Sequence, residues 1–278
     1  MTTPTPAQIQ ARRATFRQLH ASAGCFAIPN PWDLGSARYL AHLGFKALAS
    51  TSSGCAWAHG TFDGGMALEA VLAHLRDMVA ATDLPINADF ENGFARSPEE
   101  VARHVRQAID TGIAGVSIED STGHPDAPLF DITQGAERMR AAREAIDASG
   151  QNVMLIGRAE NFFVGRPDID DAIARLRAYA DAGADCLYAP AIHTREQIAA
   201  VVAACAPKPV NVLIGGTSAF TMADMAELGV RRVSVGGGLA RAAWGGFMRA
   251  ARELAEHGRF DGFEGAAPGR ELNQLFKS

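Results

Sequence analysis

Residues 87–94 form a polar stretch directly behind a short apolar run, and they contain side chains suited to ion binding or proton transfer. Asp89 and Glu91 supply carboxylates, and Asn87 supplies an amide. A serine, a proline and two glutamates at residues 97–100 then predict a capped helix start. One such stretch is weak evidence, because a lone acid at a strand end is more often a helix N-cap than a metal ligand.

Polar side chains also follow the other apolar runs of the chain. Each run is short enough for a buried strand, and helix-like spacing of apolar residues comes after it. The residues at or near these strand ends are Ser53 and Gly54, Asp63, Glu119, Arg158 and Asn211. His124 joins these candidates because its loop follows Glu119, although a lone loop histidine is rarely catalytic. The recurrence is stronger evidence for a site than any single residue.

If these strand ends meet at one rim, the carboxylates there need a cation. Those carboxylates belong to Asp63, Asp89, Glu91 and Glu119. A hard ion such as Mg²⁺, with Mn²⁺ as an alternative, suits oxygen ligands and is completed by water and substrate. Ser53 and the backbone N–H groups beside it offer donors to an anion. Arg158 would hold a substrate carboxylate through two hydrogen bonds, or else form a structural ion pair.

The elements that must position these residues follow a regular alternation. Eight apolar segments, each followed by an amphipathic helical pattern, predict a (β/α)8 TIM barrel, in which the site lies at the carboxyl ends of the strands. Four glycines, Gly44, Gly112, Gly183 and Gly229, each separate a helix from the next strand. A doubly wound open sheet is the less favoured alternative, since no G-x-G-x-x-G motif follows the first strand. We expect one domain over residues 1–278, with a helical tail at 248–278.

The composition is that of an ordinary globular protein. The chain has 278 residues, is 47% hydrophobic and has a formal net charge of -5. No basic stripe indicates nucleic-acid binding, and no apolar segment has the length of a membrane span. Without the apolar core of a signal peptide, the expected location is the cytoplasm.

Taken in order, these segments resemble the isocitrate lyase/phosphoenolpyruvate mutase superfamily, roughly from residue 30 to residue 247. The resemblance rests on residues 52–54, 87–94, 115–120, 158–161 and 185–190. It implies a (β/α)8 barrel that pairs by exchanging its last helix, as a homodimer or homotetramer. It also implies Mg²⁺ and a small 2-oxo acid or enolpyruvate-like carboxylate as substrate.

The resemblance also assigns roles to single residues at the metal. Asp89 matches the metal-site acid at the third strand, and Asp63 and Glu119 match acids that act through water on the metal. Asn87 stands where many members have an aspartate that binds the metal directly, and its amide oxygen is still able to ligate. Ser53 and Gly54 match donors to the substrate anion, and the last match is the carboxylate-binding Arg158.

The loop after Glu119 departs from two activities of the superfamily. Isocitrate and methylisocitrate lyases have a cysteine there that protonates the product, and phosphoenolpyruvate mutases have a lysine and an asparagine. Residues 121–126 contain none of these.

The resulting prediction is a Mg²⁺-dependent lyase that cleaves a C–C bond of a small 2-oxo- or 2-hydroxy-dicarboxylate, by decarboxylation or retro-aldol cleavage. The metal would stabilise the enolate that develops. Two alternatives stay open. One is P–C bond chemistry like that of phosphoenolpyruvate mutase or phosphonopyruvate hydrolase, and the other is a barrel that binds a keto acid without catalysis.

Overall fold

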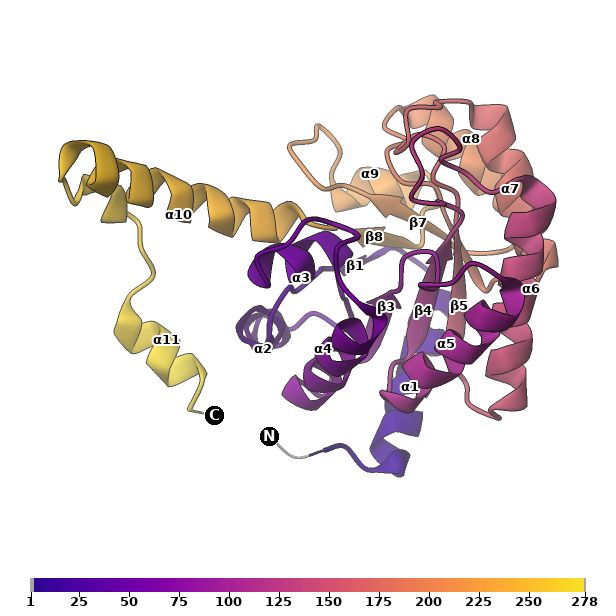
Figure 1. The fold of residues 1–278 in the computed structure, drawn as a ribbon, viewed down its shortest axis with the longest axis horizontal. Coiled ribbons are helices and arrows are strands. Elements are labelled where there is room, and N and C mark those ends of the chain that lie inside the picture. The colour runs from indigo at the N-terminus through magenta and orange to yellow at the C-terminus, as the bar shows by residue number, and fades with distance from the viewer. Residues whose placement is uncertain (1–2, 278) are drawn as a thin grey trace.

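The computed structural model describes residues 3–277, whose parallel strands form a nearly closed barrel with helices around it (Figure 1). The eight strands pair in the order β1-β8-β7-β6-β5-β4-β3-β2. Between β1 and β2, the Ala49 N–H donates to the Pro29 carbonyl at 3.1 Å. The (β/α)8 barrel predicted from the sequence is confirmed.

The strands are short, as is usual where side chains fill a small barrel. They are β1 (Phe26–Ile28), β2 (Leu48–Ala49), β3 (Ile86–Asp89), β4 (Gly115–Glu119), β5 (Met154–Arg158), β6 (Cys186–Tyr188), β7 (Val210–Leu213) and β8 (Arg232–Ser234). The helices are α1 (Pro6–Ala21), α2 (Leu34–His42), α3 (Ser52–Ala58), α4 (Leu68–Ala81), α5 (Pro98–Asp110), α6 (Ile132–Ala148), α7 (Ile169–Asp181), α8 (Arg195–Cys205), α9 (Met222–Glu227), α10 (Gly238–His257) and α11 (Gly269–Leu275), with a short η1 (Asp261–Phe263).

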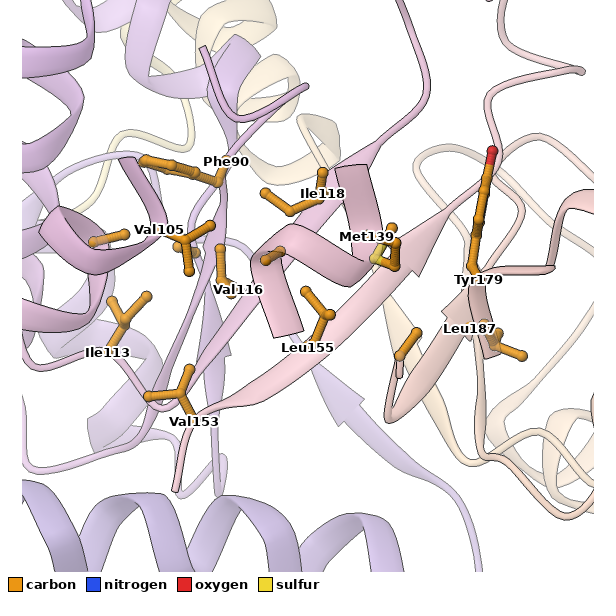
Figure 2. Close-up of a cluster of buried hydrophobic side chains, with 14 of the residues drawn as sticks. Phe90, Val105, Ile113, Val116, Ile118, Met139, Val153, Leu155, Tyr179 and Leu187 are labelled. Atoms are coloured by element: carbon orange, nitrogen blue, oxygen red, sulfur yellow. The ribbon is translucent and has the colours of Figure 1, made fainter. Parts of the chain in front are cut away.

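The core has two layers because successive residues of a strand point to opposite faces. Outward residues such as Val116 and Leu155 pack against the helices in a large apolar cluster (Figure 2). Inward residues such as Met154 and Ile156 pack inside the barrel with Phe16 of α1. The polar strand-end residues share the inward register, which directs them into the barrel mouth.

The four glycines between helices and strands behave as the sequence predicts. Gly44, Gly112, Gly183 and Gly229 have φ of +85°, +93°, +105° and +80°. This left-handed region is open to glycine without steric cost, so each helix can end and turn into the next strand.

The second strand ends directly at a short helix. Residues 52–58 form α3, and the Thr51 side chain caps it by accepting from the Gly54 N–H at 3.4 Å. Apart from Trp57 its residues are small, so it has no apolar stripe by which the sequence could reveal it. Its N-terminus brings Ser52 and Ser53 to the barrel mouth.

The C-terminal segment leaves the barrel. α10 extends away from β8, and the chain then turns back to α11 (Figure 1). The Phe276 ring, just after α11, packs on the outside of α2, with the Arg38 guanidinium 5.3 Å from its centroid. The end of the chain thus contacts the barrel exterior at α2, and exchange of a helix between subunits stays a prediction. None of the helices in residues 3–277 is both long and apolar enough to cross a membrane.

Candidate active site

Arg158, the last residue of β5, lies between three carboxylates at the barrel mouth. Its Nη1 is 3.2 Å from Asp89 Oδ1 and 3.1 Å from Glu119 Oε2, while its Nε donates to Glu160 Oε1. The strand register explains part of this, because Glu119 of β4 pairs directly with Arg158 of β5. The rings of Tyr188 and Phe163 lie 5.2 Å and 5.9 Å from the guanidinium carbon. None of these three ion pairs uses Nη2.

The charges of this cluster perturb one another. Burial raises the pKa of Glu119 well above its ordinary value, although the nearby Arg158 opposes the shift. Burial also disfavours the charged form of Arg158, but Glu160 and Glu119 outweigh it and raise the pKa of the guanidinium. The arginine therefore stays charged and is held in one orientation.

A cavity of about 90 Å³ opens beside Arg158. It reaches from the strand ends into the barrel and is lined mainly by polar side chains and glycine backbone. Its polar lining residues include Asn30, Ser50, Ser52, Ser53, Asp63, Asn87, Asp89, Ser117, Arg158, Tyr188, Arg232 and Ser234. Residues that are far apart in the sequence therefore meet around one space, as the strand-end pattern predicts.

Two of the carboxylates on this cavity are next to each other. Asp89 Oδ2 accepts from the Ser52 N–H at 2.9 Å, and the Asp89 N–H donates to Ser50 Oγ at 2.9 Å. Burial raises the pKa of Asp63, and the charge of Asp89 adds to the shift. Burial, then the charges of Asp89 and Asp63, also raise the pKa of Glu91 to about 7.

The donor set fits a hard cation that takes few ligands from the protein. The carboxylates of Asp63, Asp89, Glu91, Glu119 and Glu160 gather at this mouth, and Arg158 pairs with the last-named and with Asp89 and Glu119. Asn87 Oδ1 is buried without a hydrogen-bond partner. No three His, Cys, Asp or Glu side chains in the described part of the chain converge to hold an ion unaided. Carboxylate and amide oxygens are the ligand type that suits a hard cation such as Mg²⁺.

The remaining predicted residues lie at different distances from this cavity. Ser53 lines it, whereas Gly54 is buried in packing, where an added Cβ would meet Thr51 Cγ2 at 2.7 Å. Asn211 is fully buried beneath it and donates to Ser234 Oγ at 3.0 Å. His124 lies on an exposed loop and does not line the cavity.

Several site residues have no role in the sequence prediction. Glu160 orients Arg158, Tyr188 covers it, and Arg232 lines the cavity from β8. The available signal was their spacing, because polar residues two apart on an apolar strand share its inward face. Arg232 and Ser234 show that pattern around Val233.

A buried network behind the site holds Glu160 in place. Asp120 Oδ1 accepts from the Glu160 N–H at 2.8 Å. Asp120 Oδ2 accepts from the Tyr179 hydroxyl at 2.5 Å and from Arg175 Nη1 at 3.0 Å. The loop before α6 belongs to the same network, because Arg175 also donates to the Phe130 carbonyl at 2.7 Å. α7 therefore fixes the two strand ends that position Arg158.

Known proteins share both the sequence pattern and the fold. The family model described as phosphoenolpyruvate phosphomutase matches residues 16–255. A solved structure from Burkholderia cenocepacia J2315, a provisionally assigned lyase/mutase, is 47% identical with a TM-score of 0.95, covering 98% of each chain. A 2,3-dimethylmalate lyase structure, described as a member of the PEP mutase/isocitrate lyase superfamily, is 25% identical with a TM-score of 0.84, covering 98% of this chain and 95% of its own.

A relative from Bradyrhizobium named oxaloacetate decarboxylase is 29% identical over 245 residues, covering 81% of this chain and 78% of its own. The range matched by the family model includes all eight strands and every residue that lines the cavity. The chain belongs to the phosphoenolpyruvate mutase/isocitrate lyase superfamily, and it is an enzyme of that superfamily's lyase and mutase kind.

Proposed function

We propose that the protein is a Mg²⁺-dependent lyase that cleaves a C–C bond of a small 2-oxo- or 2-hydroxy-dicarboxylate, with decarboxylation as the first reaction to test. The observation that supports this most is the fixed Arg158 beside a carboxylate-rich cavity. An arginine binds a carboxylate, and carboxylate oxygens of the protein bind a hard cation. Arg158 and the acidic side chains of the cavity together therefore suit a substrate with carboxylate groups.

The residues proposed to hold the cation are Asp89 and Asn87, with Asp63, Glu91 and Glu119 around them. Asn87 contributes a neutral amide oxygen, which is now without a partner. Asp89 already accepts from the Ser52 N–H, and that bond fixes the orientation of its carboxylate. When bound, the ion supplies Lewis-acid stabilisation of negative charge developing on the substrate. Mn²⁺ is the alternative ion for the same donors.

The residues proposed to hold the substrate lie around the same cavity. Arg158 presents Nη2 to a carboxylate while its other nitrogens stay bound to Asp89, Glu119 and Glu160. Because these bonds exist before binding, little orientation entropy is lost when the substrate enters. Ser53, at the N-terminus of α3, adds a hydroxyl donor. It follows β2, which β3 and β4 separate from the β5 strand that carries Arg158.

The direct test is turnover of a substrate panel by the purified full-length protein. Oxaloacetate, 2-hydroxy diacids and methyl-substituted malates are incubated with Mg²⁺, with Mn²⁺ or with EDTA, and products are followed by NMR. We expect metal-dependent C–C cleavage of at least one diacid, inhibited by oxalate, which mimics the enolate. If every diacid in the panel is left intact in the presence of either ion, the proposal is wrong.

The family description favours one other reaction strongly enough to test. The matching model is described as phosphoenolpyruvate phosphomutase, so phosphoenolpyruvate and phosphonopyruvate belong in the same panel. The loop at residues 121–126 lacks the lysine and asparagine expected for that chemistry. Phosphorus NMR separates the two reactions, because only P–C chemistry changes the phosphorus signal.

We also propose a homodimer or homotetramer in which α10 is exchanged. This helix extends from the barrel (Figure 1). It also exposes large apolar side chains. They are Leu239, Trp244, Phe247, Met248 and Leu254. Exposed apolar surface of this kind on one helix favours burial against another copy.

A further inference from the structure

Arg232 is a second arginine on the cavity, and the proposed chemistry does not use it. It is the first residue of β8 and is only 2% exposed, yet it lines the same cavity as Arg158. The paired residues Arg158, Tyr188, Asn211 and Arg232 form a continuous row across β5 to β8. The cavity thus has an arginine at each end of that row.

The surroundings of Arg232 are neutral. Its Nε donates to Asn211 Oδ1 at 2.8 Å, and its Nη1 lies 3.4 Å from His20 Nε2. Because His20 Nδ1 lies 2.8 Å from the Phe16 carbonyl and donates to it, Nε2 is left as an acceptor and the ring is neutral. Across residues 3–277, no carboxylate forms an ion pair with Arg232.

A buried charge without a counter-ion is costly, so this arrangement needs an explanation. Arg158 has three carboxylates as partners, whereas Arg232 has none. The cavity wall between them includes Ser234 and Tyr188, whose hydroxyl groups are able to donate to an anion. The buried charge of Arg232 therefore has neutral donors beside it and no carboxylate partner from residues 3–277.

We propose that Arg232 is an anion-binding residue that receives the second carboxylate of a short dicarboxylate ligand. One carboxylate then binds at Arg158 and the cation, and the other enters the barrel and supplies the missing counter-ion. The inference rests on the proposed function in taking this cavity as the substrate site. It makes Arg232 a specificity residue that selects diacids over monoacids of the same length.

Asn211 offers a way to test the charge without removing the arginine. Asn211→Asp places a carboxylate where Nε of Arg232 now meets an amide oxygen. That variant should gain thermal stability, because the buried cation acquires an internal partner, and it should lose affinity for diacids. A purely structural Arg232 predicts the gain in stability without any change in binding.

The experiment is calorimetric titration of the full-length protein, with Mg²⁺ present, using succinate and its monoacid match butyrate. We expect the wild type to prefer succinate by about 10- to 100-fold, the size of one hydrogen-bonded charge contact. Arg232→Gln and Asn211→Asp should each remove the preference by weakening succinate binding, and Arg232→Lys should keep part of it. Thermal melts check that each variant is folded. If Arg232→Gln does not fold, the Asn211→Asp variant alone decides the test.

Two results would overturn the inference. One is a wild type that binds both acids equally, and the other is a succinate preference that survives both Arg232→Gln and Asn211→Asp. Neither acid is turned over, so these results are separate from the assay of the proposed function. A protein with no lyase activity but an Arg232-dependent succinate preference would refute the reaction and keep the anion site.

Discussion

Under the proposed function, we expect substrate binding to depend most on Arg158, whose guanidinium is held by Asp89, Glu119 and Glu160. Arg158→Gln removes the charge, and Arg158→Lys keeps the charge but loses the two-nitrogen geometry. A charged hydrogen bond contributes about 1.5–3 kcal/mol, so we expect kcat/KM to fall about 100-fold in the Arg158→Gln variant. The fall should be smaller in the Arg158→Lys variant. Steady-state kinetics with melting temperatures as a folding control test this. A folded Arg158→Gln variant within threefold of wild type would contradict it.

His20 makes the stability of the barrel depend on pH. Burial, and then the charge of Arg232, lower its pKa to about 3. An unfolded histidine titrates near pH 6.5, so between these values the unfolded chain takes up a proton that the folded chain does not. Stability from His20 is therefore complete above about pH 6.5 and is lost as the pH falls towards 3.

His20→Gln tests this dependence, because glutamine can still accept from Arg232 but does not titrate. As the pH falls from 7 to 4, the free energy of unfolding of the wild type should decrease by up to about 3 kcal/mol more than that of the variant. Urea unfolding at both values measures the difference. An equal gap between the two proteins at pH 7 and pH 4 would show that His20 takes up its proton equally in the folded and the unfolded chain, so that burial does not lower its pKa.

At the scale of elements, α3 and the end of β8 are in unusually close contact. A Cβ added at Gly237 would lie 2.7 Å from Ser53 Oγ and 3.1 Å from the Trp57 ring. Gly237→Ala must therefore displace the Ser53 hydroxyl on the cavity, because the Trp57 ring closes the other side. We expect about a tenfold fall in kcat/KM, in keeping with the sensitivity of positioned groups to small shifts. Gly216→Ala, where a Cβ meets nothing within 4 Å, is the matched control and should behave as wild type.

The hydrogen-bond network behind Glu160 predicts that a substitution in α7 lowers the free energy of unfolding. Tyr179→Phe removes the hydroxyl that donates to Asp120, a carboxylate only 2% exposed. Arg175 and the Glu160 N–H still bind Asp120, so we expect a loss of about 1–2 kcal/mol rather than unfolding. Denaturant titration measures it, with Tyr39→Phe as control because Tyr39 is 45% exposed. Equal stability of the two variants would mean that the Tyr179 hydroxyl contributes nothing.

The elements differ in how far the sequence could reveal them. The capped start of α5 at Ser97 and the glycine ends such as Gly112 are local signals, and both proved correct. α3 has no such signal, because its seven residues, small except for Trp57, show no apolar stripe. Arg232 has a local signal in its spacing of two from Ser234, which places it on the inward face of the strand. Its burial as an unpaired charge depends on strand pairing and on α1, which that spacing does not specify.

At the scale of the whole molecule, α10 is the element that we expect to determine the oligomeric state. Only Ala240 of this 20-residue helix is buried, while Trp244 and Phe247 are exposed and contact each other at 5.4 Å between ring centroids. A helix with so little packing gains little from its own barrel, since most helical stability comes from burying an apolar face. Its partner is therefore expected to be another copy of the chain.

Phe247→Glu should break that association, because it places a charge in the centre of the apolar face. Light scattering with size exclusion should show a dimer or tetramer for wild type and a smaller species for the variant at micromolar concentration. Leu43→Glu, an equally radical change at a residue that is 54% exposed on the barrel exterior, should leave the mass unchanged. If wild type is a monomer, or if Phe247→Glu keeps the wild-type mass, the helix is not exchanged. A monomeric but active wild type would further show that the cavity is complete within one chain.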